Sequence, residues 1–140
     1  MGLGPLVALE GSMNGEKYVE LLKDVLIPEI EAAGVPMTFM QDNAPCHKSK
    51  QVLDFLGKTD LNLLDWPPQS PDLNPIENLW AIIKARRKKK FGFPTNKDQL
   101  IEQIFEIWND VDIELCETLS DSVINRLSEC LRLGGRPTKY

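Results

Sequence analysis

Two carboxylates, Asp42 and Glu77, are the residues of this 140-residue sequence whose surroundings best suit catalysis. Asp42 directly follows a short apolar run, residues 37–41, which predicts a strand. Glu77 follows a proline-rich turn and begins a predicted helix. Residues 43–76, 34 in all, have room for one helix, one strand and one turn. Because open α/β sheets bind ligands at the carboxyl ends of their strands, we expect both carboxylates to lie together at the rim of a sheet.

A divalent cation is the partner that such a pair needs. Two carboxylates ~4 Å apart repel each other by ~4 kcal/mol at an effective dielectric of ~20. Hard oxygen ligands suit Mg²⁺ or Mn²⁺, which turn this repulsion into ligation. Two such ions can stabilise both the attacking and the leaving oxygen of a phosphodiester. The pair therefore predicts metal-dependent phosphoryl transfer.

The same residues also have a purely structural interpretation. The segment 74–77, Asn-Pro-Ile-Glu, matches a capping box, in which Asn caps a helix and Glu reaches back to the cap. Asp42 and Asn43 are equally suited to a turn. The spacing alone favours this interpretation, since two acidic residues are a weak signal.

Hydrophobic periodicity predicts an α/β domain around these residues. Short apolar runs predict strands, and apolar residues at helical spacing predict helices. The middle strand lacks polar alternation, which predicts burial on both faces. Pro28 should kink or divide the first helix. The expected strands cover residues 6–10, 37–41 and 61–64. The expected helices cover about 12–33, 49–56, 75–90 and 112–133, and a further helix begins at 95–96.

Two of these helices have apolar stripes that should face the core. In the helix that follows Glu77, the predicted inward residues are Ile76, Leu79, Trp80 and Ile83. In the last helix they recur at four-residue steps: Leu115, Leu119, Val123, Leu127 and Leu131. Trp80 lies on the first of these stripes, and Trp108 lies on the apolar face of the helix that begins at 95–96, so we expect both to pack in the core.

Six cations within seven residues form a basic run near the end of the helix that starts at Pro75: Lys84, Arg86, Arg87, Lys88, Lys89 and Lys90. Such a run can contact a DNA backbone and release counterions. Alternatively, it is a solvated helix end whose cations suit the macrodipole.

Bulk composition indicates one ordinary globular domain. The net charge is −5 and 42% of the residues are apolar. A compact nucleic-acid-binding module is usually basic, so any contact with DNA must be local. Three scattered cysteines and one histidine predict free thiols and argue against a zinc site. No apolar run approaches the ~20 residues that cross a bilayer. We expect a soluble, intracellular protein that does not bind membranes.

Two long strings resemble the signature blocks of mariner-superfamily transposases. They are Gln-Asp-Asn-Ala-Pro-Cys-His at 41–47 and Trp-Pro-Pro-Gln-Ser-Pro-Asp-Leu-Asn-Pro-Ile-Glu-Asn-Leu-Trp at 66–80. The spacing of the two blocks resembles the branch whose Asp-Asp-Glu triad ends in Glu. Residues 2–6, 11–18 and 134–140 are also similar to that branch.

The resemblance implies a ribonuclease H-like α/β fold with carboxy-terminal helices and a catalytic domain that processes DNA. Asp42 would be the second triad carboxylate and Glu77 the third, both ligating Mg²⁺ or Mn²⁺. Asn43, His47 and Asn78 would be neighbours, with His47 expected to bond to backbone. The implied activity is metal-dependent endonuclease and strand transfer in DNA transposition and integration. It would act on transposon ends in the nucleus.

Three features depart from the family pattern. The first triad Asp and the strands that lead to it have no counterpart, nor do the DNA-reading helix-turn-helix domains. Residues 122–126 stand where the family commonly has Ser-Met-Pro-Arg-Arg. We therefore expect residues 1–140 to form a single partial catalytic domain, truncated at its amino end and inactive or impaired alone. Its first strand, 6–10, would expose unpaired backbone and favour either a homodimer or aggregation.

Two alternatives to an impaired enzyme remain open. The chain could be a non-catalytic module for DNA binding or protein interaction, derived from a transposase. It could also be a truncated or pseudogene product without an independent role.

Overall fold

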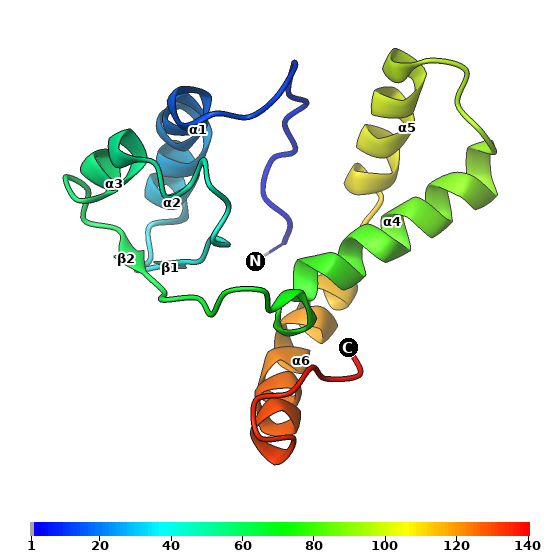
Figure 1. Cartoon of the computed structure of the whole chain (residues 1–140). Helices are drawn as coiled ribbons and strands as arrows, with labels where there is room; N and C mark the ends of the chain where they lie inside the picture. Colours follow the sequence, from blue (N-terminus) through cyan, green and yellow to red (C-terminus); the bar gives the residue numbers. More distant parts are fainter. Residues whose placement is uncertain (1) are drawn as a thin grey trace. The chain divides into compact units, whose positions relative to one another are not determined.

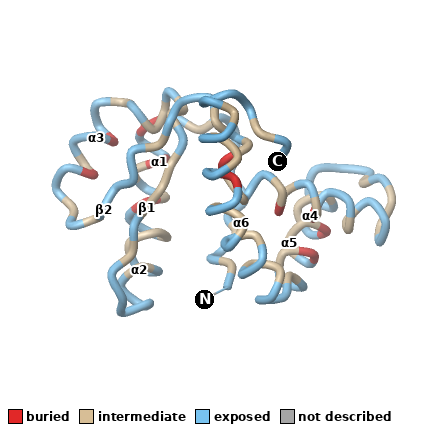
Figure 2. Tube along the Cα trace, turned by 90° about the horizontal axis from the view of Figure 1, so that it is seen from below, coloured by how far each residue is buried: buried red, intermediate tan, exposed pale blue. Residues whose placement is uncertain are grey.

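The computed structural model describes residues 2–140, which divide into two compact units. The strand unit comprises residues 9–69, and the helical unit comprises residues 2–8 and 70–140. Buried positions occur in both units (Figure 2). Each unit is described by itself, so one domain over residues 1–140 stays a prediction.

The first helix of the strand unit has three segments: α1 (Gly15–Leu21), η1 (Leu22–Leu26) and α2 (Ile27–Ala33). The side chain of Asn14 caps it by accepting a hydrogen bond from the Lys17 amide at 2.9 Å. The η1 segment is a π-helix that ends at Leu26, two residues before Pro28. Proline has no amide hydrogen and its ring collides with the carbonyl four residues earlier. The predicted interruption at Pro28 is therefore a wider turn within a continuing helix.

Two short parallel strands follow this helix. The strand β1 (Thr38–Phe39) pairs with β2 (Asn62–Leu63), in the register Thr38 to Asn62 and Phe39 to Leu63. The helix α3 (Lys50–Leu56) connects them, as Figure 1 shows. Both strands are shorter than predicted. The burial on both faces that was predicted for residues 37–41 is wrong, because Thr38 is exposed and Phe39 is only partly buried. Within the described residues each strand has a single hydrogen-bonded neighbour.

The strand predicted at residues 6–10 is not formed. Its apolar side chains satisfy a strand pattern, but a strand also needs a neighbour for its backbone groups. Only β1 and β2 pair among the described residues. Residues 6–10 have no regular secondary structure, and just before them the Gly4 carbonyl accepts a hydrogen bond from Trp108 Nε1 at 3.1 Å. A homodimer formed through this segment stays a prediction.

The core of the strand unit lies between α1–η1 and α3. Its buried residues are Tyr18, Leu22, Val52 and Leu56. The two helices approach closely at Gly15, where an added Cβ would collide with the side chain of Ser49. Glycine is therefore required at this position by space rather than by backbone conformation.

The helical unit consists of three long helices and a short one. They are η2 (Pro71–Leu73), α4 (Pro75–Phe91), α5 (Lys97–Asn109) and α6 (Ile113–Arg132). Asn96, one of the two predicted caps of α5, accepts from the Gln99 amide at 2.8 Å. Asp112 caps α6 by accepting from the Leu115 amide, also at 2.8 Å. No helix among the described residues is long and apolar enough to cross a membrane.

The helical-unit core is made of Leu79, Ile83 and Ile107. Trp80 and Trp108 pack against this core, as predicted, with ring centroids 5.5 Å apart. Ile76, however, is 39% exposed and does not join the predicted stripe. It lies in the first turn of α4, where its side chain is open to solvent.

The predicted stripe on α6 is wrong in its second half. Leu115 and Leu119 pack on the core, but Leu127 is 46% and Leu131 is 82% exposed. Each four-residue step advances by about 400°, so the stripe turns by about 40° per step away from the core. The side of α6 that faces the core carries Leu115 and Leu119 and continues through Ser122 to Arg126, which is buried.

Truncation at Ile83, which is fully buried, should destabilise the helical unit. We expect Ile83→Ala to lower the free energy of unfolding by about 2–5 kcal/mol, through lost burial and a cavity. Ile124→Ala is the matched control, since Ile124 is 72% exposed, and should change it by less than about 0.5 kcal/mol. Urea unfolding followed by tryptophan fluorescence measures both. Equal losses in the two variants would contradict the assignment of the core.

Candidate active site

Asp42 lies in the loop that follows β1. Its Oδ1 accepts a hydrogen bond from the Ala44 amide at 3.0 Å, which forms the turn predicted for Asp-Asn. The side chain nevertheless remains 63% exposed. The turn therefore uses one oxygen of a carboxylate that stays open to solvent.

His47 is the second partner of the Asp42 carboxylate. Its Nδ1 lies 2.7 Å from Asp42 Oδ1 and 3.4 Å from the Asp42 backbone oxygen. The expected bond to backbone is thus the weaker of two contacts, and the stronger one is made to the carboxylate. Both contacts that orient the Asp42 side chain fall on Oδ1. This arrangement fixes the carboxylate while its Oδ2 is left as the oxygen available to a cation.

Tyr18 supports the His47 ring from α1. The two rings stack with centroids 4.0 Å apart and planes inclined by 29°. The Tyr18 hydroxyl donates to Gln41 Oε1 at 2.8 Å. Burial raises the pKa of Tyr18 to about 12, with smaller contributions from Cys46 and Asp42. Tyr18 therefore stays neutral and provides a rigid aromatic surface under the histidine.

Asn43 links the two signature segments within the strand unit. Its Nδ2 donates a 2.8 Å hydrogen bond to the Trp66 carbonyl. Trp66 opens the proline-rich block, and Asn43 follows Asp42 directly. The family string at 41–47 thus has a structural function beside the carboxylate, because it holds the loop after β1 to the chain that leaves β2.

Glu77 lies in the first turn of α4 and is exposed. Asn74 caps this helix, since its Oδ1 accepts from the Ile76 amide at 3.2 Å. The Asn74 amide donates instead to the Pro71 carbonyl at 3.0 Å, within η2. The donor that a capping-box glutamate would satisfy is therefore already bonded. The structural interpretation of Glu77 as a capping residue loses its basis.

The structure places the two candidate carboxylates in different units. Asp42 belongs to the strand unit and Glu77 to the helical unit. Their approach to one another therefore stays a prediction. Over residues 2–140 there is no group of three or more His, Cys, Asp or Glu side chains arranged to hold a metal ion.

The basic run on α4 separates into bonded and solvent-facing cations. Arg87 is half-buried and donates to the Gly92 carbonyl and to Gln103 Oε1, both at 3.1 Å. Lys90 Nζ lies 2.7 Å from Glu106 and 3.4 Å from Asp110. These two cations hold α4 to α5. Lys90 is exposed in spite of these ion pairs. The solvent-facing members are Lys84, Lys88 and Lys89, with Arg86 partly exposed.

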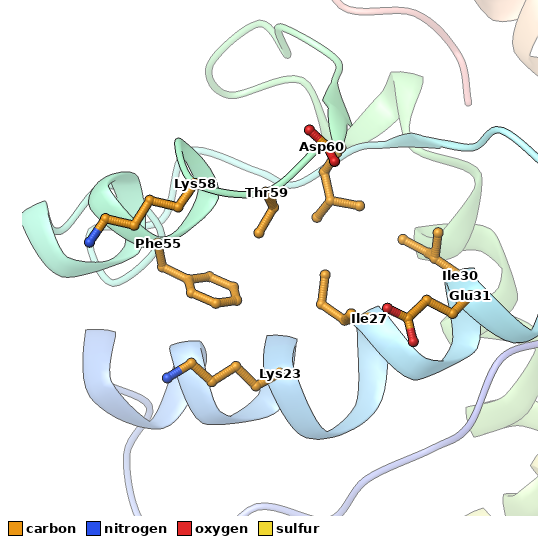
Figure 3. A pocket seen from close by; sticks show the side chains of 9 residues that line it. Lys23, Ile27, Ile30, Glu31, Phe55, Lys58, Thr59 and Asp60 are labelled. Carbon is orange, nitrogen blue, oxygen red and sulfur yellow. The ribbon is translucent and has the colours of Figure 1, made fainter.

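A pocket of about 440 Å³ in the strand unit is separate from these residues. Its walls come from the helix that carries Lys23 and Ile27 and from α3 with the chain after it, and Phe55 faces the pocket (Figure 3). Neither Asp42 nor His47 lines it.

Comparison with known structures identifies the fold. The catalytic domain of Mos1 mariner transposase superposes with a TM-score of 0.79 at 20% identity, over 92% of this chain and 66% of that one. Structures of the same domain with raltegravir and either Mn or Mg match equally well, with TM-scores of 0.78 and 0.79. The predicted ribonuclease H-like fold is confirmed.

Sequence comparison identifies the family. Residues 3–101 match the DDE superfamily endonuclease model, and the chain belongs to this family. Its relatives include the Tcb1 transposase of Caenorhabditis briggsae, 34% identical over 99% of this chain and 50% of the relative. The Tc1 transposase of Caenorhabditis elegans is 32% identical over the same shares. The predicted transposase relationship is confirmed, and the chain spans about half the length of these relatives.

Sequence reasoning overlooked a set of residues around Glu77. The buried Arg126 of α6 contacts residues on both sides of the Glu77 position. Helical periodicity could have predicted its burial, because Arg126 lies seven residues after Leu119, on the same side of the helix as Leu115 and Leu119. A basic residue on an apolar line is commonly taken to point outwards, which is why it was not predicted.

The raised pKa of Tyr18 predicts a loss of stability in alkali. The folded state holds the phenolic proton more tightly than the unfolded state, whose pKa is near 10. The resulting stabilisation is fully present below about pH 10 and is lost as the pH rises towards about 12. Tyr18→Phe should remove this pH dependence and the late component of the phenolate absorbance titration. A titration component near pH 12 that survives in Tyr18→Phe would contradict the assignment.

Proposed function

We propose that residues 1–140 are the greater part of a transposase active-site domain that cuts and joins DNA with divalent metal ions. Its DNA would be transposon ends and its location the nucleus. Support comes from the family and fold and from the two signature segments. A Mos1 structure is described as a paired-end complex with left transposon end, and it matches this chain with a TM-score of 0.79.

The observation that carries this proposal is the state of the two carboxylates. Asp42 is oriented by His47 and Ala44 through one oxygen and is 63% exposed. Glu77 is exposed at the start of α4, where the cap is completed without it. Asp42 is thus oriented and open to solvent, as a metal ligand requires, and Glu77 is open to solvent and not needed for the cap.

The donor chemistry of these two residues fits Mg²⁺ or Mn²⁺. Both are hard oxygen donors, and Nδ1 of His47, the single histidine of the sequence, bonds to Asp42. Asp42 and Glu77 would hold the ion. When bound, it would neutralise charge on the phosphodiester that reacts. His47 would keep the Asp42 carboxylate in a fixed orientation.

Residues 1–140 supply two of the three carboxylates that the family resemblance implies. We therefore propose that this chain alone binds metal weakly and cleaves DNA poorly or not at all. A non-catalytic DNA-binding or interaction module is the alternative function, and the basic run on α4 favours its DNA-binding version. A homodimer also stays a prediction.

The same helix offers a track for the DNA backbone. Lys84 and Lys88 lie seven and eleven residues after Glu77. At about 100° and 1.5 Å per residue, both fall within about 20° of the Glu77 line, about 10 and 16 Å along the axis. Both are exposed, in contrast to Arg87. We propose that they contact DNA phosphates adjacent to the reacting phosphodiester, which lies at the metal ion held by Glu77.

Removal of either carboxylate should weaken Mn²⁺ binding. We expect Asp42→Asn and Glu77→Gln each to weaken it by about tenfold or more, because a charged oxygen ligand is lost. Asp98→Asn is the matched control, since Asp98 is an exposed carboxylate in the first turn of α5. Electron paramagnetic resonance of free Mn²⁺ measures the affinity. Equal affinities for the parent chain and both site variants would reject the metal site.

Neutralising the lysine track should weaken DNA binding and reduce its salt dependence. We expect Lys84→Gln with Lys88→Gln to lower the slope of log affinity against log salt by about 1.8, since each lost duplex phosphate contact contributes about 0.9. Lys23→Gln with Lys58→Gln makes the same charge change in the strand unit. Fluorescence anisotropy with a labelled duplex measures both slopes. Equal effects of the two double variants would mean that net charge, rather than this track, governs binding.

A further inference from the structure

Arg126 is the most deeply buried charged residue described, at 1% exposure. A buried guanidinium is unfavourable unless hydrogen-bond acceptors surround it. Its three nitrogens have acceptors: Nε donates to Ser122 Oγ at 2.8 Å, Nη1 to the Asp72 carbonyl at 2.8 Å, and Nη2 to Asn78 Oδ1 at 2.9 Å. The guanidinium thus joins α6 to η2 and to the first turn of α4.

These contacts lie on either side of Glu77 along the chain. Asp72 belongs to η2, which precedes the Asn74 cap, and Asn78 directly follows Glu77. A planar guanidinium holds its acceptors in a fixed fork. Rotation of the first turn of α4 would therefore break at least one of the two bonds.

The chain after α6 returns to the same place. The Thr138 amide donates to Asp72 Oδ2 at 2.7 Å. The Tyr140 ring lies against the guanidinium, with its centroid 4.7 Å from Arg126 Cζ. Figure 1 shows this final segment turning back from the end of α6. The Thr138 bond lowers the pKa of the Asp72 carboxyl, so this bond weakens only in acid.

We propose that Arg126, Asp72, Thr138 and Tyr140 form a latch that fixes the turn and the first helical turn carrying Glu77. They are positioning residues for the candidate site, since none of them needs to touch metal or DNA. The role of the latch in metal binding rests on the proposed function of Glu77. The mechanical part does not, because it concerns only the order of residues 70–79.

The latch differs from an ordinary core contact in the part of the chain that it holds, which is residues 70–79. The core of the helical unit is formed by Leu79, Ile83 and Ile107, further along α4. Loss of Tyr140 leaves that core in place and removes only the aromatic face on Arg126. A latch therefore predicts local loosening at residues 70–79, whereas a merely structural role predicts loosening that spreads to α5.

Hydrogen exchange in the full chain separates these outcomes. We expect Tyr140→Ala to speed exchange of the amides of residues 72–79 by about fivefold or more, with residues 97–109 unchanged. Tyr140→Phe keeps the ring and should behave as the parent. Asp72→Ala and Asp72→Asn form a second pair, in which only Asn keeps an acceptor for the Thr138 amide. Unchanged exchange at 72–79 in both alanine variants, or equal acceleration in α5, would overturn the latch.

Mn²⁺ affinity then separates failure of the latch from failure of the proposed function. If Glu77 is a ligand, Tyr140→Ala should weaken Mn²⁺ binding several-fold while the melting temperature stays near that of the parent. If Glu77→Gln leaves Mn²⁺ affinity unchanged, the metal function fails and the exchange result still decides the latch. If Glu77→Gln weakens binding but Tyr140→Ala does not, the positioning role is wrong.

Discussion

A buried positive charge constrains the whole beginning of α4. Arg126 cannot remain in the interior of the helical unit unless the Asp72 carbonyl, Asn78 and Ser122 are all in reach at once. These acceptors come from three separate elements. Whatever sequence occupies η2 and the first turn of α4 must therefore keep its backbone where the guanidinium needs it. The proline-rich string before Glu77 helps, because Pro71 and Pro75 each fix a backbone angle in advance.

The loop around Asp42 is ordered by a different means. Among the residues of this loop no charged side chain is buried. Several short polar contacts order it, in place of one buried guanidinium. The carboxylate accepts from its own turn and pairs with His47, and His47 rests on the buried ring of Tyr18. The chain of contacts thus runs from the core of the strand unit outward to an exposed oxygen. In the strand unit the exposed carboxylate is itself the end of a contact network, whereas in the helical unit the network holds the residues on either side of Glu77.

Sequence reasoning predicted the helices well and the strands poorly, for a physical reason. Helices satisfy their backbone bonds locally, so caps such as Asn96 and Asp112 and stops such as Gly34 define them from nearby residues. A strand exists only when a partner lies beside it, and residues 6–10 have none in the described chain. Burial on α6 failed because four-residue steps drift around a helix of 3.6 residues per turn.

Prediction of the candidate site had a similar limit. Family strings identified Asp42 and Glu77, and local chemistry anticipated the Asx turn and the Asn74 cap. Neither could reveal that the Asn74 amide is taken by Pro71, which is what frees Glu77 from capping. Nor could they reveal that Arg87 and Lys90 bond to α5 and so differ from their neighbours. Both facts depend on where a donor points, and that is set by tertiary contacts.

The helix α4 carries a carboxylate at its positive end, structural cations on one side and solvent-facing lysines in line with Glu77. The net charge of the chain is −5, so any contact with an anionic partner must be local. The solvent-facing lysines of the basic run are free to make that contact, whereas Arg87 and Lys90 bond to α5.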